Sequence, residues 1–199
     1  MTGGVSMKKA VRILAITLIV AFGVVYFAFI ADRGTEPKPA IMETNDEVSK
    51  LIVRNLDTDY PNSPREVARF YSRIMQSYYA LDYTEEELIK LVSQSRILFD
   101  PELLEENPEE DYITNLKAEI KSFEEKEQII TNYKVDEVGE IEYYSAEGIE
   151  YAEVSVEYSL KNKDGLSKVY EDYMMRKDEE GSWKILGWKL TPESVIEND

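Results

Sequence analysis

The chain contains neither histidine nor cysteine among its 199 residues. Their absence excludes Ser-His-Asp and Cys-His catalysis and thiol redox chemistry, and it removes the usual ligands of zinc, copper and haem iron. Without cysteine there is also no disulfide framework. The nine glycines form neither a phosphate-binding loop nor a dinucleotide-binding fingerprint. We therefore expect no catalytic residue, no metal site and no cofactor.

Basic residues are scarce in most of the chain. All 40 acidic residues follow residue 31, together with only 20 of the 23 basic ones. Such a negative field repels nucleic acid and anionic lipid headgroups, so nucleic acid is not expected as a partner. Basic proteins, cationic peptides or loosely held divalent cations would be attracted instead. The simpler interpretation is that the acid keeps the domain soluble.

One long apolar segment contains no charge at all, residues 13–31 (ILAITLIVAFGVVYFAFIA). As a helix it would be roughly 28 Å long, about the thickness of the hydrocarbon core of a bilayer. Lys8, Lys9 and Arg12 precede this segment. Basic residues on that side predict a cytoplasmic N-terminus and an extracellular C-terminal domain.

A cleaved secretory signal is the alternative for this segment. Signals have an apolar core of about 7–15 residues that ends in an A-x-A pattern of small residues. Here the apolar segment is longer, and Tyr26 and Phe29 stand two positions before Ala28 and Ala31, where a small residue is needed. We favour an uncleaved signal anchor and predict a single-pass protein of the cell membrane.

The chain is predicted to contain one folded domain, with shorter segments on both sides of it. We predict a cytoplasmic N-terminus over residues 1–12, the transmembrane helix over 13–31 and a linker over 32–45 that contains two prolines. Residues 46–191 are long enough to bury a core as one domain, and residues 192–199 form a tail.

Helical signals fill the first half of this domain. Ser63-Pro64-Arg65-Glu66 is a capping box with proline at the first helical position, and the apolar spacing that follows predicts a helix to about residue 81. Thr84-Glu85-Glu86-Glu87 is a second capping box, and Asp100-Pro101 and Asn107-Pro108 each open a further helix. For residues 46–56 the pattern leaves helix and strand open.

After Lys126 the apolar period changes from 3.6 to 2, which predicts strands. Residues 149–161 alternate strictly, and turns at Lys163-Asp164-Gly165 and at residues 178–181 lead into two further strands. Residues 128–138 and 140–146 form one bent strand or two. Three to four helices followed by a curved antiparallel meander of four to five strands give an α+β fold.

This order, closing on WKILGW at residues 183–188, resembles the NTF2-like, cystatin-type α+β cone. The whole chain resembles an uncharacterised family of Gram-positive, clostridial-type membrane proteins of unknown function. The segments that carry this resemblance are the anchor after Met7-Lys8-Lys9, Tyr60-Pro61 with residues 63–67, residues 83–88 (YTEEEL), residues 168–173 (KVYEDY) and residues 183–190 (WKILGWKL). The resemblance implies a fold and a location, and it brings no activity.

Large aromatic side chains are the remaining candidates for a site, because NTF2-like domains often enclose a pocket between the concave sheet and the helices. Those that could line it are Tyr143, Tyr144, Tyr158, Tyr170, Tyr173, Trp183 and Trp188. Core packing is the simpler interpretation of these residues. No carboxylate is placed inward by the pattern.

Two functions therefore stay open. The first is a non-enzymatic binding or assembly module at the cell envelope, which contacts envelope proteins or itself. The second is a pocket-based small-molecule binder or carboxylate-dependent enzyme of NTF2-like type, which requires an inward Asp or Glu. A cation-responsive acidic surface is a third possibility.

Overall fold

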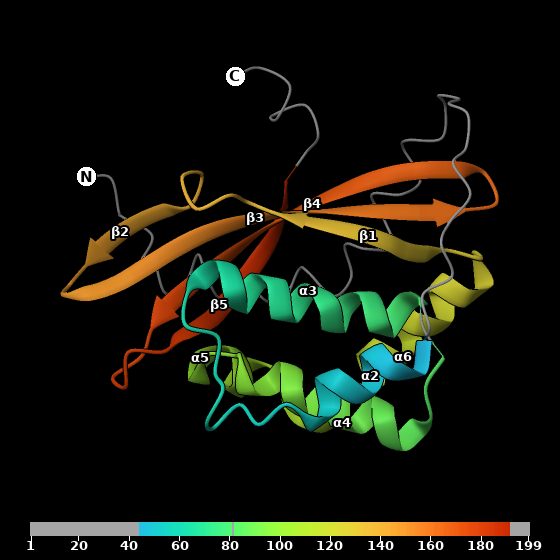
Figure 1. Ribbon diagram of the computed structural model, residues 1–199, viewed down its shortest axis with the longest axis horizontal. Coiled ribbons are helices and arrows are strands. Elements are labelled where there is room, and N and C mark those ends of the chain that lie inside the picture. Colours follow the sequence, from blue (N-terminus) through green and yellow to red (C-terminus); the bar gives the residue numbers. More distant parts are fainter. Residues whose placement is uncertain (1–43, 81, 192–199) are drawn as a thin grey trace, which may run out of the picture.

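Residues 44–80 and 82–191 are described by the computed structural model, and within them five helices precede five strands (Figure 1). This order confirms the α+β class that the sequence predicts. The helices are α2 (Thr44–Val53), α3 (Pro64–Ala80), α4 (Glu85–Ile97), α5 (Pro101–Glu106) and α6 (Glu109–Glu125). The strands are β1 (Ile129–Val135), β2 (Glu142–Ala146), β3 (Ile149–Asn162), β4 (Gly165–Lys177) and β5 (Trp183–Thr191).

Capping residues fix where the helices begin. The Thr84 hydroxyl accepts from the backbone N–H of Glu87, and the Glu87 carboxylate accepts from the N–H of Thr84, so the predicted capping box of α4 is complete. At α3 the Ser63 hydroxyl accepts from the N–H of Glu66 in the same way. The Glu66 carboxylate, however, pairs with Arg69 at 2.5 Å.

Residues 46–56, for which the sequence pattern allows a helix or a strand, are helical in their first part. Helix α2 runs from Thr44 to Val53, so it begins two residues before the predicted start of the domain at residue 46. Val48 and Leu51 are buried on one side of it, three residues apart, as an amphipathic helix requires. A salt bridge of 2.7 Å between Glu47 and Arg73 joins α2 to α3.

The sheet is antiparallel, and the long strand β3 organises it. Strands β3, β4 and β5 follow one another as predicted, with hydrogen-bonded neighbours in the order β1-β3-β4-β5. Strand β2 pairs with the first five residues of β3, and β1 pairs with the second half of the same strand. The first two strands are therefore separate, and they do not extend the meander. The 14 residues of β3 leave room for two partners along one edge.

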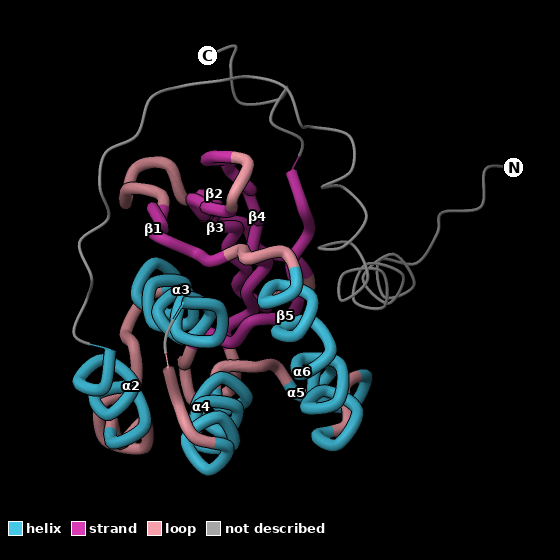
Figure 2. The backbone as a smooth tube through the Cα atoms, turned by 90° about the vertical axis from the view of Figure 1, so that its right-hand side faces the viewer, coloured by secondary structure: helices cyan, strands magenta, loops and turns pink. Residues whose placement is uncertain are grey.

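Helix α3 lies between the sheet and the helices α2 and α4 (Figures 1 and 2). Alternate residues of β3 face α3 and are buried: Ala152, Val154, Val156, Tyr158 and Leu160. The apolar side of α3 meets them, and every described residue of its predicted apolar stripe is buried. The core of the domain is therefore the layer between α3 and the inner face of the sheet.

A second set of contacts joins the start of α5 to β4 and β5. Asp100, which is 2% exposed, caps α5 by accepting from the N–H of Glu102 at 2.9 Å. Its carboxylate also binds the Arg176 guanidinium through two hydrogen bonds, of 2.9 and 2.5 Å. The Asp100 N–H donates to the carbonyl of Ile185, and the Ile185 N–H donates to the carbonyl of Leu98, both at 2.8 Å. The segment before α5 thus covers part of the β5 edge.

The predicted transmembrane helix, residues 13–31, lies outside the described residues. The same holds for residues 1–12, the tail 192–199 and most of the predicted linker. Among the residues that are described, none of the helices combines the length and the hydropathy that crossing a bilayer requires.

Candidate functional site: a buried row of hydroxyl groups ending on Glu171

Glu171 lies on the inner face of the sheet because of the hairpin register. The β3–β4 turn pairs Asn162 with Gly165, and this register sets Val156 opposite Glu171 and Val154 opposite Tyr173. Directly opposed residues of an antiparallel pair point to the same face. Since Val156 faces the core, Glu171 does too, and it is 0% exposed.

A row of hydrogen bonds runs from Glu171 across the sheet to α3. The Tyr173 hydroxyl is bonded to Oε2 of Glu171, and it lies 2.9 Å from the Tyr158 hydroxyl. The Tyr158 hydroxyl lies 3.0 Å from the Ser72 hydroxyl, which donates to the carbonyl of Ala68 at 2.8 Å. The row thus links β4, β3 and α3 entirely within the core.

The pKa of Glu171 is raised from 4.5 to about 8. Burial is the main cause, and the negative charges of Glu119 and Asp172 add to it, whereas the hydrogen bond from Tyr173 acts in the opposite direction. The second carboxylate oxygen, Oε1, is buried without a hydrogen-bond partner in the described part of the chain. Glu171 therefore favours the neutral carboxylic acid.

A second acid, the partly buried Glu119, approaches the same interior from α6. Burial raises the pKa of Glu119 from 4.5 to about 7, and the nearby Tyr79 hydroxyl and Lys126 lower it. Neither Oε1 of Glu119 nor the Tyr79 hydroxyl has a hydrogen-bond partner of acceptable geometry among the described residues. Two carboxyl groups and several tyrosines therefore share one region of low dielectric.

Aromatic rings fill the space beside the row. The ring of Tyr71 lies 5.6 Å from that of Tyr173 and 5.9 Å from that of Trp188, and the ring of Phe99 lies 5.7 Å from that of Tyr71 and 6.1 Å from that of Trp188. Tyr71 and Tyr173 are at most 1% exposed. This is the dense packing of a core, and it supports the interpretation of these aromatics as packing residues.

Four of the seven predicted pocket residues contribute to this inner layer. Tyr158 and Tyr173 are fully buried and belong to the row, Trp183 is 7% exposed, and Trp188 is partly buried against the core. Burial raises the pKa of both tyrosines well above 10, so both hydroxyls keep their protons.

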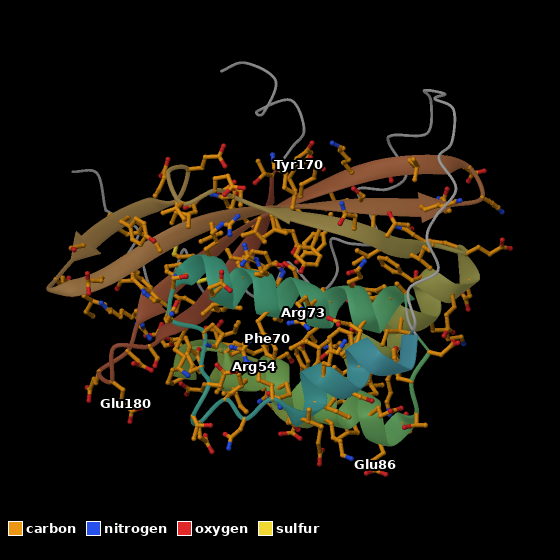
Figure 3. The ribbon with its side chains drawn as sticks, in the orientation of Figure 1. Arg54, Phe70, Arg73, Glu86, Tyr170 and Glu180 are labelled. Carbon is orange, nitrogen blue, oxygen red and sulfur yellow. The ribbon has the colours of Figure 1, made fainter. Side chains whose placement is uncertain are left out.

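The other three residues lie elsewhere, so the structure does not bring the seven together. Tyr143 is 55% exposed on β2, where its ring lies 6.0 Å from that of Trp183. Tyr144 is 39% exposed and stacks on Tyr151 at 5.2 Å. Tyr170 lies on the side of the sheet away from the helices (Figure 3).

A family model described as a domain of unknown function, DUF6715, matches residues 4–188. The chain belongs to the DUF6715 family. No curated protein matches it. Membership of DUF6715 brings no activity, so the roles of individual residues rest on their geometry. The matched segment contains both the predicted anchor and the described domain up to β5, so the DUF6715 model spans the two parts together.

Sequence reasoning missed Glu171, Ser72 and Glu119, which carry the polar chemistry of this DUF6715 domain. Glu171 could have been found from the register: a two-residue turn at Lys163-Asp164 places it opposite Val156, which belongs to the apolar face of β3. Ser72 lies within the apolar stripe of α3, beside Tyr71. Glu119 could have been found from the helical spacing, because it stands three residues after Leu116 and four before Phe123, both on the buried side of α6.

No group of three or more Asp and Glu side chains in the described part of the chain has a geometry that could hold a metal ion. Glu171 and Glu119 also lack the negative charge that a cation site needs, because their raised pKa values favour the neutral acids. What this arrangement can do chemically is gain or lose a proton inside the core.

Proposed function

We propose that this chain is a single-pass membrane protein whose α+β domain works on the outer face as a non-enzymatic binding or assembly module. The apolar segment 13–31, with three basic residues and no acidic one before it and all 40 acidic residues after it, supports the anchor and its orientation. We further propose that the domain is of NTF2-like type in a Gram-positive envelope protein. Helices followed by an antiparallel sheet that covers α3 support this fold.

One observation carries the binding role, the open edge of β2. The outer edges of β5 and β1 each meet another part of the domain. The segment Leu98–Asp100 covers β5 at Ile185, and Gln76 of α3 donates to the carbonyl of Thr131 on β1 at 3.0 Å. Within the described residues, β2 pairs only with β3. Such an edge offers its unpaired N–H and C=O groups to another extended chain.

The β2–β3 hairpin also presents apolar surface beyond the helices (Figure 1). Tyr143 and Tyr144 are 55% and 39% exposed, and Ile149 after the turn is 37% exposed. Aromatic side chains that protrude beside an open edge add side-chain contacts to backbone pairing. The hairpin therefore has both of the elements that strand addition uses.

The charge of this hairpin selects the partner. Residues 137–150 contain five glutamates and no basic residue. Glu137 and Glu150 pair with Arg65 and Lys177 elsewhere in the domain. A second copy of this chain would bring the same negative charge to the same edge, whereas an extended segment rich in Lys or Arg is attracted. We therefore propose a basic envelope protein as the partner.

Photo-crosslinking in intact cells tests this function. The full chain would carry a photoreactive residue at Tyr144 and, as a control, at the exposed Thr114 of α6. We expect an adduct with a second protein from position 144 only. Glu142→Lys should abolish the adduct, whereas Glu110→Lys on α6, with the same net charge, should leave it. Recovery of the monomer alone, or equal adducts in both charge variants, would contradict the proposal.

Glu171 favours the second candidate, a small-molecule binder or carboxylate-dependent enzyme. An acid with a raised pKa beside tyrosine hydroxyls is the arrangement that general acid–base chemistry needs. A ligand would have to displace tyrosines that already fill this interior. A ligand screen by thermal shift separates the two functions. A compound that stabilises the wild type but not Glu171→Ala would favour the second candidate.

A further inference from the structure

The row Ser72–Tyr158–Tyr173–Glu171 has fewer protons than contacts. Each hydroxyl has one proton to donate, and the row consists of three contacts plus the bond to the carbonyl of Ala68. Four hydrogen bonds therefore require four protons, whereas the three hydroxyls supply three. The fourth has to come from the carboxyl group at the end.

The bond to α3 fixes the direction of donation. The Ser72 hydroxyl donates its single proton to the carbonyl of Ala68, at 2.8 Å. Tyr158 must then donate to Ser72, and Tyr173 must donate to Tyr158. Because Tyr173 then donates its proton to Tyr158, a hydrogen bond between Tyr173 and Glu171 forms only if the carboxyl group is protonated and donates. All four contacts can therefore be hydrogen bonds at once only around a neutral Glu171 that donates to Tyr173; where Tyr173 instead donates to Oε2, one contact between hydroxyls is left without a proton.

Loss of that proton changes the donation at the other end of the row. An ionised Glu171 can only accept, so Tyr173 donates to the carboxylate and Tyr158 donates to Tyr173, while Ser72 keeps its bond to the carbonyl of Ala68. No proton is then left between the Ser72 and Tyr158 hydroxyls, which join α3 to the sheet. The balance is one proton released from the core and one hydrogen bond between α3 and β3 lost.

The surroundings of Glu171 favour the neutral form at neutral pH. Asp172 neighbours it on β4, Glu119 faces the interior from α6, Tyr71 approaches from α3 and Tyr158 from β3. All of these groups are acidic or neutral. Burial, together with the charges of Glu119 and Asp172, raises the pKa of Glu171 to about 8, and neither of these charged groups is a cation that would stabilise the carboxylate.

We propose that this row is a pH-sensitive element of the fold, in which a neutral Glu171 holds α3 through Ser72 and its deprotonation releases that hold. This element is independent of the binding function proposed for β2. It couples the proton activity outside the core to the tightness of the contact between α3 and the sheet. Alkaline conditions loosen the contact, and acidic conditions restore it.

Infrared spectroscopy of the purified full chain tests the first part of the proposal, that Glu171 is a neutral acid that loses its proton in alkaline conditions. At about pH 6 the wild type should show the carbonyl band of a protonated carboxylic acid, and Glu171→Gln should lose one component of it. That component should fall by half at about pH 8, where the pKa of Glu171 lies. Glu119→Gln is the matched control, since it removes the other acid with a raised pKa and leaves the Glu171 component. Identical bands in the wild type and Glu171→Gln at about pH 6 would overturn the proposal.

Amide hydrogen exchange tests the second part of the proposal, that deprotonation of Glu171 loosens α3. After correction for the intrinsic effect of pH, amides of α3 around Ser72 should lose protection in the wild type between about pH 6 and pH 9. Glu171→Gln should show no such loss, because its amide donates to Tyr173 at every pH. If Glu171→Gln does not fold, Tyr173→Phe serves instead, since it cuts the row and should leave α3 insensitive to pH. The same loss of protection in wild type and variant would refute the link to α3.

Discussion

At the scale of single residues, buried acids determine how this protein responds to pH. A carboxyl group with a raised pKa in the folded state binds its proton more tightly than the unfolded chain does. The stability that it contributes is complete below about pH 4.5 and falls as the pH rises towards its folded pKa. For Glu171 this fall extends to about pH 8, and for Glu119 to about pH 7. We therefore expect a domain that is most stable on the acidic side of neutrality.

Glu171→Gln should flatten this profile. The amide has the size of the acid and can donate to Tyr173, but it does not titrate. Between about pH 5 and pH 8 the free energy of unfolding of the wild type should fall more steeply than that of the variant, by up to about 1.4 kcal/mol per pH unit. Urea denaturation across this range measures both slopes, with Glu142→Gln on the exposed strand β2 as a control. Parallel profiles for the wild type and Glu171→Gln would contradict the assignment.

Sequence alone could have placed Glu171 but not its chemistry. The alternation in β3 and the short turn after it determine which residues of β4 face inward, and that register includes Glu171. The raised pKa depends on what α3 and α6 bring over the sheet, namely Tyr71 and Glu119. Contacts between segments so far apart in the chain follow from packing, and no local pattern encodes them.

At the scale of elements, capping residues set the helix boundaries and can be tested one by one. Thr84→Ala removes the acceptor for the N–H of Glu87 and should lower the free energy of unfolding by about 1 kcal/mol. Ser93→Ala is the matched control in the same helix. The Ser93 hydroxyl is exposed and bonds only to its own helix at Ile89, so its loss should change stability by less than about 0.5 kcal/mol. Equal effects of the two substitutions on the denaturation midpoint would argue against the cap.

The junction between α5 and the sheet depends on Asp100. Asp100→Ala removes the cap of α5 and leaves the Arg176 guanidinium, whose side chain is only 20% exposed, without its two-fold contact. We expect a loss of about 2–4 kcal/mol in the free energy of unfolding. Asp100→Asn retains a capping oxygen and should lose less. Glu102→Ala removes the more exposed partner of Arg176 and should lose under about 1 kcal/mol. An Asp100→Ala effect as small as that of Glu102→Ala would contradict this account.

Elements with local signals were predictable, and pairings at a distance were not. The two capped helices and the strands β3, β4 and β5 follow from caps, turns and apolar period alone. The sequence did not show that β1 and β2 share one edge of β3. Pairing there is decided by the length of β3 and by α3, whose Gln76 and Arg65 bond to carbonyls of residues in and beside β1.

At the scale of the whole molecule, charge is divided along the chain. The basic residues Lys8, Lys9 and Arg12 stand before the apolar segment, and every acidic residue stands after it. If residues 13–31 span the membrane, this division gives one orientation, because basic residues are retained on the cytoplasmic side. The acidic domain then lies outside, where the proton concentration is set by the environment. The row ending on Glu171 would be exposed to those changes.

Protease treatment of intact protoplasts tests this orientation. Because the domain is predicted to lie outside, protease added to the medium should remove a C-terminal epitope tag while a cytoplasmic marker protein stays intact. Deletion of residues 13–31 should move the domain from the membrane fraction to the soluble fraction, since about 19 apolar residues supply the energy that holds it there. Reversing the flanking charge, with Lys8, Lys9 and Arg12 changed to Glu, should reduce external digestion. A tag that survives protease in intact protoplasts and is cut only after lysis would place the domain inside and refute the proposed topology.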